Sequence, residues 1–242
     1  MLDRNSSKPL YAQLEELLRS QIVNSELAPG QMIPSENELS RMCGISRMTV
    51  RSVITTLVKE GLLFRVQGKG TFVARPKISA SSPAYVGIRE QLEKLGYSTE
   101  TRLLTLEEMV PPKKIAGLLN LPDNAAVRHI RRVRYADGEP VSIHESFIPC
   151  SLWERCDPGR IRTDQLCTIL KDECGLTPAR VLESLESVLA TKEEADLLKI
   201  EKGYPLLLLR ETNFTNTGIP YEHTKIAFRG DKIRLDFEYH LS

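Results

Sequence analysis

Residues 34–51 read PSENELSRMCGISRMTVR, an order that two short helices joined by a tight turn explain. Ser35 followed three residues later by Glu38 forms a capping box, in which each side chain bonds the backbone N–H of the other residue. Gly44 suits the turn, and Ser46 is the expected N-cap of the next helix. Two short helices around a glycine turn predict a helix-turn-helix.

The second of these helices is predicted to run to Glu60 and to stop at Gly61. Arg47 and Arg51 lie one turn apart and share an outer face with Thr49, near the start of the helix. In helix-turn-helix proteins this part of the helix reaches base edges, where arginine binds guanine through two hydrogen bonds. Threonine and further arginines suit phosphates. The residues expected to face inward are Val50, Ile54, Leu57 and Val58.

Flanking segments extend the motif on both sides. Residues 9–25 repeat apolar side chains at helical spacing and predict an amphipathic helix. Residues 62–66 and 71–73 are apolar runs around Gly68, which predicts a β-hairpin, the wing of a winged helix-turn-helix. A glycine-rich tip with Lys69 can approach a minor groove closely, although a tight turn without DNA contact explains the same residues.

The net charge of +1 hides an uneven distribution along the 242 residues. Residues 41–75 hold seven Lys and Arg against Glu60 alone, whereas residues 78–242 hold 22 basic and 25 acidic side chains. This asymmetry indicates that only the first part meets a polyanion, and a solvated basic surface is the alternative. The length fits two domains, and a hydrophobic content of 41% allows sizeable cores.

Cysteine usage and the lack of targeting signals indicate a cytoplasmic protein. No C-x-x-C pair occurs and the histidines lack metal-ligand spacing, so we expect no zinc site, no disulfide framework and no cofactor. No apolar run reaches the length of a membrane span, and the N-terminus lacks a signal-peptide core. A reducing cytosol fits such a chain. The five cysteines are Cys43, Cys150, Cys156, Cys167 and Cys174.

The second part of the chain predicts an α+β domain. A polar segment with two prolines suggests a linker, and a helix with Ile88, Leu92 and Leu95 inward follows it and ends at Gly96. An internal repeat of about 80 residues then combines a helix and a hairpin in each copy. The expected domains are residues 1–75 and 84–242, with the linker at 76–83. The expected elements are helices 115–121 and 194–200 and strands 127–135, 141–148, 179–190, 206–214, 221–228 and 233–240.

Arg132 and Arg134 stand two residues apart on a predicted strand and therefore project from one face, opposite Arg131. Two arginines on the same face suit the capture of a carboxylate or phosphate. Ion pairs with nearby Glu side chains on an exposed strand are the alternative. His144 and Glu145 lie on the strand expected to pair with this one.

Residues 34–39, 45–51, 57–63 and 68–73 together resemble the signature of GntR-family transcriptional regulators. The resemblance implies DNA contacts at Arg47, Thr49 and Arg51 and at the wing tip around Gly68. Asn37 departs from the pattern, because many members carry an arginine there that can read a guanine. The complete set of candidate DNA-binding residues is Ser35, Asn37, Ser46, Arg47, Thr49, Arg51, Gln67, Gly68, Lys69 and Gly70.

Residues 84–242 resemble the UTRA effector domain of the HutC-type GntR subfamily, through residues 130–140, 145–149, 205–210 and 222–231. The resemblance implies an antiparallel sheet domain akin to chorismate lyase, through which members form homodimers. Members that sense amino-sugar phosphates commonly carry Glu at the position of His144, Ser at that of Gln165 and Tyr at that of Cys167. This chain departs from that pattern at all three positions. The implied effector-binding residues are Ile88, Arg89, Arg132, Arg134, His144, Gln165, Cys167 and Glu222.

The expected function is a repressor that binds a palindromic operator as a homodimer and responds to a small anionic metabolite, a sugar phosphate or an organic acid. One alternative is a chorismate-lyase-like enzyme. The sequence has no catalytic motif that supports it, so we expect no enzyme activity. The other is an architectural DNA-binding protein without an effector. The size of the second domain argues against that alternative.

Overall fold

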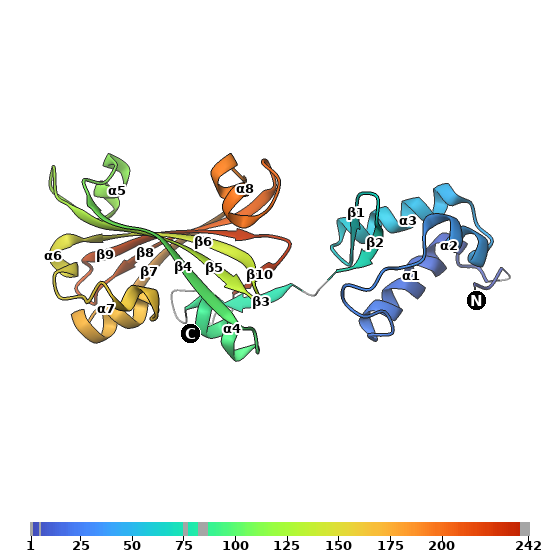
Figure 1. The fold of residues 1–242 in the computed structure, drawn as a ribbon, viewed down its shortest axis with the longest axis horizontal. Coiled ribbons are helices and arrows are strands. Elements are labelled where there is room, and N and C mark those ends of the chain that lie inside the picture. The colour runs from blue at the N-terminus through green and yellow to red at the C-terminus, as the bar shows by residue number, and fades with distance from the viewer. Residues whose placement is uncertain (1, 5, 75–76, 82–86, 238–242) are drawn as a thin grey trace. The chain divides into compact units, whose positions relative to one another are not determined.

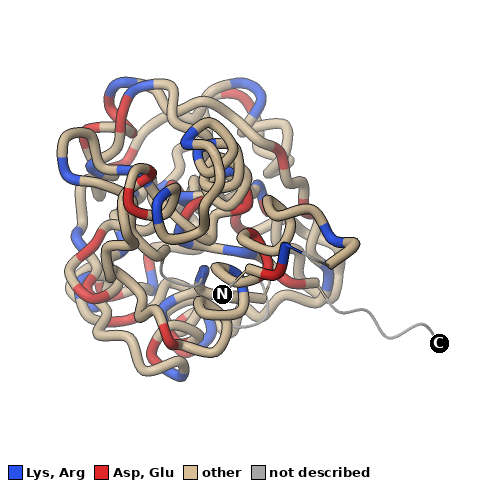
Figure 2. The backbone as a smooth tube through the Cα atoms, turned by 90° about the vertical axis from the view of Figure 1, so that its right-hand side faces the viewer, with Lys and Arg blue, Asp and Glu red and all other residues tan. Residues whose placement is uncertain are grey.

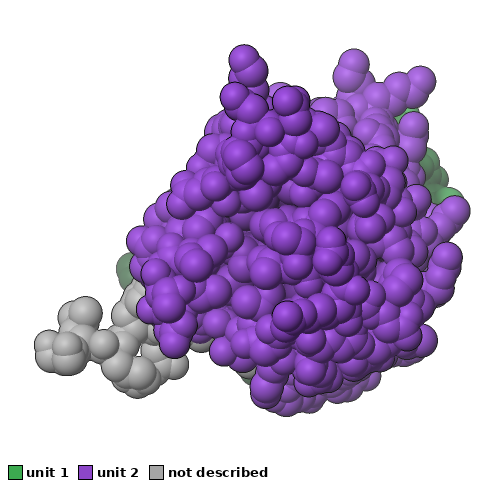
Figure 3. Space-filling model, turned by 90° about the vertical axis from the view of Figure 1, so that its left-hand side faces the viewer, with its two compact units in different colours: residues 1–77 green, residues 78–242 purple. Residues whose placement is uncertain are grey.

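The computed structural model describes residues 2–4, 6–74, 77–81 and 87–237. The chain divides into two compact units, Met1–Lys77 and Ile78–Ser242, which are coloured separately in Figure 3. Each unit has its own hydrophobic clusters, so each is described by itself.

The first unit is a winged helix-turn-helix, as predicted. Ser35 and Glu38 form the complete capping box at the start of the second helix, and Gly44 ends that helix in the left-handed conformation with φ +63°. Ser46 caps the third helix by accepting a hydrogen bond from the backbone N–H of Thr49. The elements are α1 (Leu10–Val23), α2 (Glu36–Cys43), α3 (Arg47–Lys59), β1 (Leu63–Val66) and β2 (Gly70–Val73).

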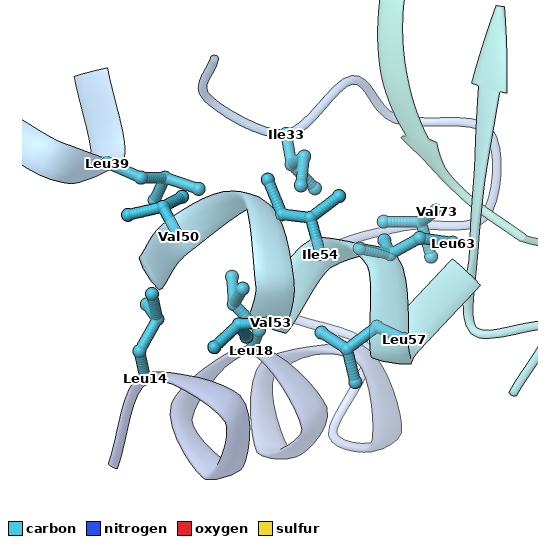
Figure 4. Close-up of a cluster of buried hydrophobic side chains, with 10 residues drawn as sticks. All are labelled: Leu14, Leu18, Ile33, Leu39, Val50, Val53, Ile54, Leu57, Leu63 and Val73. Carbon is cyan, nitrogen blue, oxygen red and sulfur yellow. The ribbon is translucent and has the colours of Figure 1, made fainter. Parts of the chain in front are cut away.

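Helix α3 is the centre of this unit's core (Figure 4). Val53 is buried beside Leu18 of α1, and Ile54 lies toward Ile33. Val53 was not among the residues predicted to face inward, whereas Val58, which was, is only partly buried. Helix α3 is contacted by α1, α2 and β1, so its buried surface is wider than one apolar stripe.

A six-stranded antiparallel sheet forms the body of the second unit, in the order β4-β5-β6-β9-β8-β7. Helices α5 and α8 lie on one face of the sheet, and α4 and α7 lie on the other (Figure 1). The strands are β4 (Thr99–Met109), β5 (Val127–Ala136), β6 (Glu139–Pro149), β7 (Arg180–Leu189), β8 (Pro205–Phe214) and β9 (Pro220–Arg229). The helices are α4 (Ile88–Lys94), α5 (Lys113–Leu118), α6 (Cys150–Trp153), the 3-10 turn η1 (Arg160–Arg162), α7 (Leu166–Cys174) and α8 (Lys192–Leu198).

The predicted internal repeat is confirmed, and each copy also contains a preceding strand, of which β7 was predicted at 179–190 and β4 was not predicted. The first copy runs β4-α5-β5-β6 and the second runs β7-α8-β8-β9. Strands β6 and β9 pair at the middle of the sheet, so the second half repeats the strand order of the first half in reverse. The repeat therefore builds one continuous sheet rather than two separate hairpins.

The predicted linker at 76–83 is corrected by the structure. Ile78–Ser81 forms strand β3, which pairs in parallel with β10 (Ile233–Asp236). Ile78 and Ala80 are buried in the core of the second unit, so burial of alternate residues overrides the polar composition of the segment. Residues 76, 82 and 83 of the expected linker, and residues 238–240 of the expected last strand, lie outside the described residues. Leu95, predicted to face inward, is exposed.

Candidate nucleic-acid interface and cavity

A groove of about 710 Å³ separates α2 and the start of α3 from the β1–β2 turn. The first turn of α3 contributes Arg47, and the start of α2 contributes Asn37. Seven of the ten candidate DNA-binding residues therefore line one surface, although they come from three separate elements. These seven are Ser35, Asn37, Arg47, Gln67, Gly68, Lys69 and Gly70.

The other three candidates lie outside the lining of this groove. The Ser46 hydroxyl accepts a hydrogen bond from the backbone N–H of Thr49 at 3.1 Å and lies 2.8 Å from the Thr49 hydroxyl. These contacts stabilise the start of α3, so Ser46 has a structural function there. Arg51 is exposed one turn further along α3.

Glu36 contacts two arginines beside the groove, and sequence reasoning missed it. Its carboxylate lies 3.4 Å from Arg47 Nε and 3.5 Å from Arg65 Nη2, and Arg65 also donates to the Thr55 hydroxyl at 3.1 Å. Acidic and basic residues are interspersed along the chain in Figure 2, and these contacts show that part of the positive charge of this unit is held in ion pairs. The carboxylate of Glu36 thus forms an ion pair with Arg47 at the groove. The two residues are 11 positions apart, and no local sequence pattern predicts this contact.

The second unit contains a partly open cavity of about 420 Å³ between the sheet and the helices α4 and α7. One face of β5, β6, β8 and β9 lines it, together with the first residues of α4 and α7. Seven of the eight residues implied as effector-binding line this cavity. They are Ile88, Arg132, Arg134, His144, Gln165, Cys167 and Glu222.

Arg132 and Arg134 are buried in the cavity wall, each with 4% of its surface exposed. Among the described residues, Nε and Nη1 of both side chains have no hydrogen-bond partner. Burial lowers the pKa of both guanidinium groups, and for Arg134 the neighbouring charge of Arg132 lowers it further. Both groups stay charged at neutral pH, because arginine is effectively always protonated there. The cavity therefore holds two desolvated cations, each with unsatisfied Nε and Nη1 donors.

Arg131 confirms that the strand divides its arginines by face. Its Nη1 lies 2.6 Å from Oε1 of Glu193 at the start of α8, on the opposite side of the sheet. The ion-pair alternative thus describes Arg131, whereas no described salt bridge involves Arg132 or Arg134.

Glu222 is held in a hydrogen-bond network on the cavity floor. Asn213 Nδ2 donates to one carboxylate oxygen at 3.0 Å, and the Thr224 hydroxyl donates to the other at 2.8 Å. The Ser146 hydroxyl lies 2.9 Å from that of Thr224. Sequence reasoning missed Ser146, Asn213 and Thr224, although the alternation that selected Arg132 also applies to their strands once the pairing is known.

His144 faces Arg132 across the β5–β6 pair and is buried. Burial, followed by the charges of Arg134 and Arg132, lowers the pKa of His144 well below 6.5. The imidazole is therefore neutral at neutral pH, and its Nε2 lies 2.9 Å from the hydroxyl of Ser142. His144 adds a polar surface to the cavity without adding a charge.

Arg89 does not line the cavity, unlike the other implied residues. Its Nε donates to Glu93 one turn along α4 at 2.7 Å, and its Nη1 donates to the carbonyl oxygen of Thr163. The side chain instead connects α4 to the segment before α7. Gly87 precedes α4 at the cavity, where a β-carbon would collide with Oε1 of Gln165.

Two further observations concern the described part of the chain alone. No three His, Cys, Asp or Glu side chains gather there in a way that could hold a metal ion. No helix in it has the length and apolar character needed to cross a membrane.

Comparison with known proteins relates both units to bacterial regulators. The model described as "Bacterial regulatory proteins, gntR family" matches residues 10–73, and the UTRA domain model matches residues 94–234. The transcriptional repressor NagR of Bacillus subtilis is 34% identical over 235 residues, 96% of this chain and 95% of that protein. The histidine utilization repressor of Pseudomonas putida is 30% identical, over 94% of this chain and 91% of that protein. The crystal structure of PhnF from Mycobacterium smegmatis shares the fold, with a TM-score of 0.64 and 24% identity over 97% of this chain and 100% of that chain.

Proposed function

Because the chain belongs to the GntR family of bacterial regulators and carries a UTRA domain, we propose that it is a repressor controlled by a small anionic metabolite. Membership places the chain among transcriptional regulators rather than enzymes. The names of its relatives support repression, since NagR and the histidine utilization regulator are both described as repressors. Because a bacterial regulator must reach DNA, we expect the protein to lie in the cytoplasm.

The buried pair Arg132 and Arg134 is the observation that carries this proposal. Burying a charge without a partner is unfavourable, and an anionic ligand with several acceptor oxygens would satisfy the free donors of both guanidinium groups. The first turn of α7 also lines the cavity, and the start of a helix favours negative charge. Glu222 would accept hydrogen bonds from ligand hydroxyls. A sugar phosphate or a hydroxy acid combines these features in a size that suits 420 Å³.

Thermal unfolding with a panel of metabolites tests the effector class. A sugar phosphate or organic acid present at a hundred times its Kd stabilises the native state by about 2.7 kcal/mol, which raises Tm by roughly 5–10 °C. Neutral sugars of the same size serve as the matched control and should leave Tm unchanged. Stabilisation by the neutral sugars alone would contradict the anionic effector. A panel without any stabilising compound would favour an architectural protein.

The protein is expected to bind a palindromic operator as a homodimer, because one helix-turn-helix reads few base pairs and a two-fold dimer reads two half-sites. Edge strand β7 offers a surface for association through the second unit, since it exposes Leu182, Leu185 and Leu189. Selection from random DNA should return inverted repeats. Sedimentation that detects only monomers, both free and on selected DNA, would contradict the dimer.

A further inference from the structure

Cys156 and Cys174 form a thiol pair outside the cavity. Cys156 follows α6, Cys174 is the last residue of α7, and their Sγ atoms lie 3.1 Å apart. Cys174 also donates to the carbonyl oxygen of Leu152 at 3.2 Å. The two thiols thus form a short hydrogen-bonded chain, in which Cys156 donates to Cys174 and Cys174 donates to the backbone of α6.

The packing around the pair holds the two thiols in this arrangement. Cys156 is buried in the cluster that contains Ile169 and Leu170 of α7, while Cys174 is partly exposed. Burial, followed by the hydrogen bond to Cys174, raises the pKa of the Cys156 thiol to about 12, although the charge of Arg160 opposes the shift. The Cys156 thiol is therefore protonated at neutral pH, and Cys174 is the more accessible of the two residues.

We propose that Cys156 and Cys174 form a reversible dithiol–disulfide couple, a modification site that ties the end of α7 to the segment after α6. An S–S bond is about 2.05 Å long, so the two sulfurs must approach by about 1 Å from their separation of 3.1 Å. Such a dithiol is reduced under ordinary cytosolic conditions and becomes oxidised when an oxidant is present.

The oxidant is a small-molecule disulfide, R–S–S–R. The thiolate of Cys174 attacks one sulfur of the oxidant, which forms a mixed disulfide and releases RS⁻. The Cys156 thiol then gives up its proton to RS⁻ as its sulfur attacks Sγ of Cys174, which forms the internal disulfide and releases the second RS⁻. The two cysteines lose two protons and two electrons, and the oxidant becomes two thiols, RSH.

The couple would act on the cavity through α7. Leu166, Cys167 and Thr168 in the first turn of this helix line the cavity, and Cys174 ends the same helix two turns later. A covalent bond at Cys174 therefore restrains the helix that forms one wall of the cavity. This inference about the thiols holds whatever the cavity binds.

Treatment of the full-length protein with oxidised glutathione tests the proposal. The wild type should lose two hydrogen atoms in its intact mass, and peptide mapping should find Cys156 joined to Cys174. The bond closes a loop of nearly 20 residues, so Tm should rise by roughly 5–10 °C and fall again after reduction. Hydrogen exchange of the α7 amides should slow in the oxidised protein.

Variants separate this pair from the remaining thiols. Cys156→Ser and Cys174→Ser should each lose the internal disulfide, whereas a Cys43→Ser/Cys150→Ser control should form it as the wild type does. Peptide mapping of the wild-type protein tests the disulfide even if a variant fails to fold. Glutathione adducts without the internal bond, or a disulfide between other cysteines, would overturn the couple. Unchanged exchange in α7 after oxidation would overturn its action on the cavity wall.

Discussion

Replacement of both Arg132 and Arg134 with Ala is expected to abolish the response of operator binding to the effector while leaving operator affinity close to wild type. An effector changes DNA affinity only through its different affinities for two conformations, a coupling that is typically 1–3 kcal/mol. Without the two guanidinium groups the anion loses its main partners, so this coupling should vanish. The candidate DNA-binding residues lie in the other unit and are unchanged.

Arg131→Ala is the matched control for the double variant. Arg131 lies on the same strand but pairs with Glu193 on the other face of the sheet, so its removal should leave the effector response intact. Denaturant unfolding tests whether the double variant has lost its effector response only because it is destabilised. Because Nε and Nη1 of both cavity arginines lack partners among the described residues, their removal should not collapse the unfolding midpoint. A collapsed midpoint, or a normal effector response, would refute their proposed function.

Arg47→Ala is expected to relax base preference within each half-site and to weaken binding by about 1–3 kcal/mol for each bidentate arginine–guanine interaction that it removes. Arg47 is exposed at the groove between α2 and the wing, where the carboxylate of Glu36 holds its Nε. Binding to a set of single-base operator variants measures the preference. If the Arg47→Ala protein binds the operator variants in the same order of affinity as the wild type, another residue reads the bases.

Arg51→Ala gives the contrasting result that makes this measurement specific. Arg51 is exposed on α3 but does not line the groove, so a phosphate contact is expected. Its loss should weaken all DNA sequences about equally and reduce the slope of log K against log salt by about one. Identical behaviour of the Arg47 and Arg51 variants would contradict the division between reading and positioning.

Features that depend on neighbouring residues could be predicted from the order of the amino acids. The capping box at Ser35 and Glu38 and the turn at Gly44 involve residues only a few positions apart, so their chemistry is visible without a fold. Strand alternation likewise placed Arg132 and Arg134 on one face and Arg131 on the other. The internal repeat was visible for the same reason, because each copy is a local helix and hairpin.

Which of these faces meet, and what they enclose, depends on how the whole unit packs. Pairing of β3 with β10 joins residues about 155 positions apart, and the ion pair between Glu36 and Arg65 spans 29. The contact between Cys156 and Cys174 and the closure of the cavity by α4 and α7 likewise arise from the packing of separate elements. Patterns of helix and strand repeat every few residues and specify which side of an element is apolar. They do not specify its partner, which is set by burial summed over the whole unit.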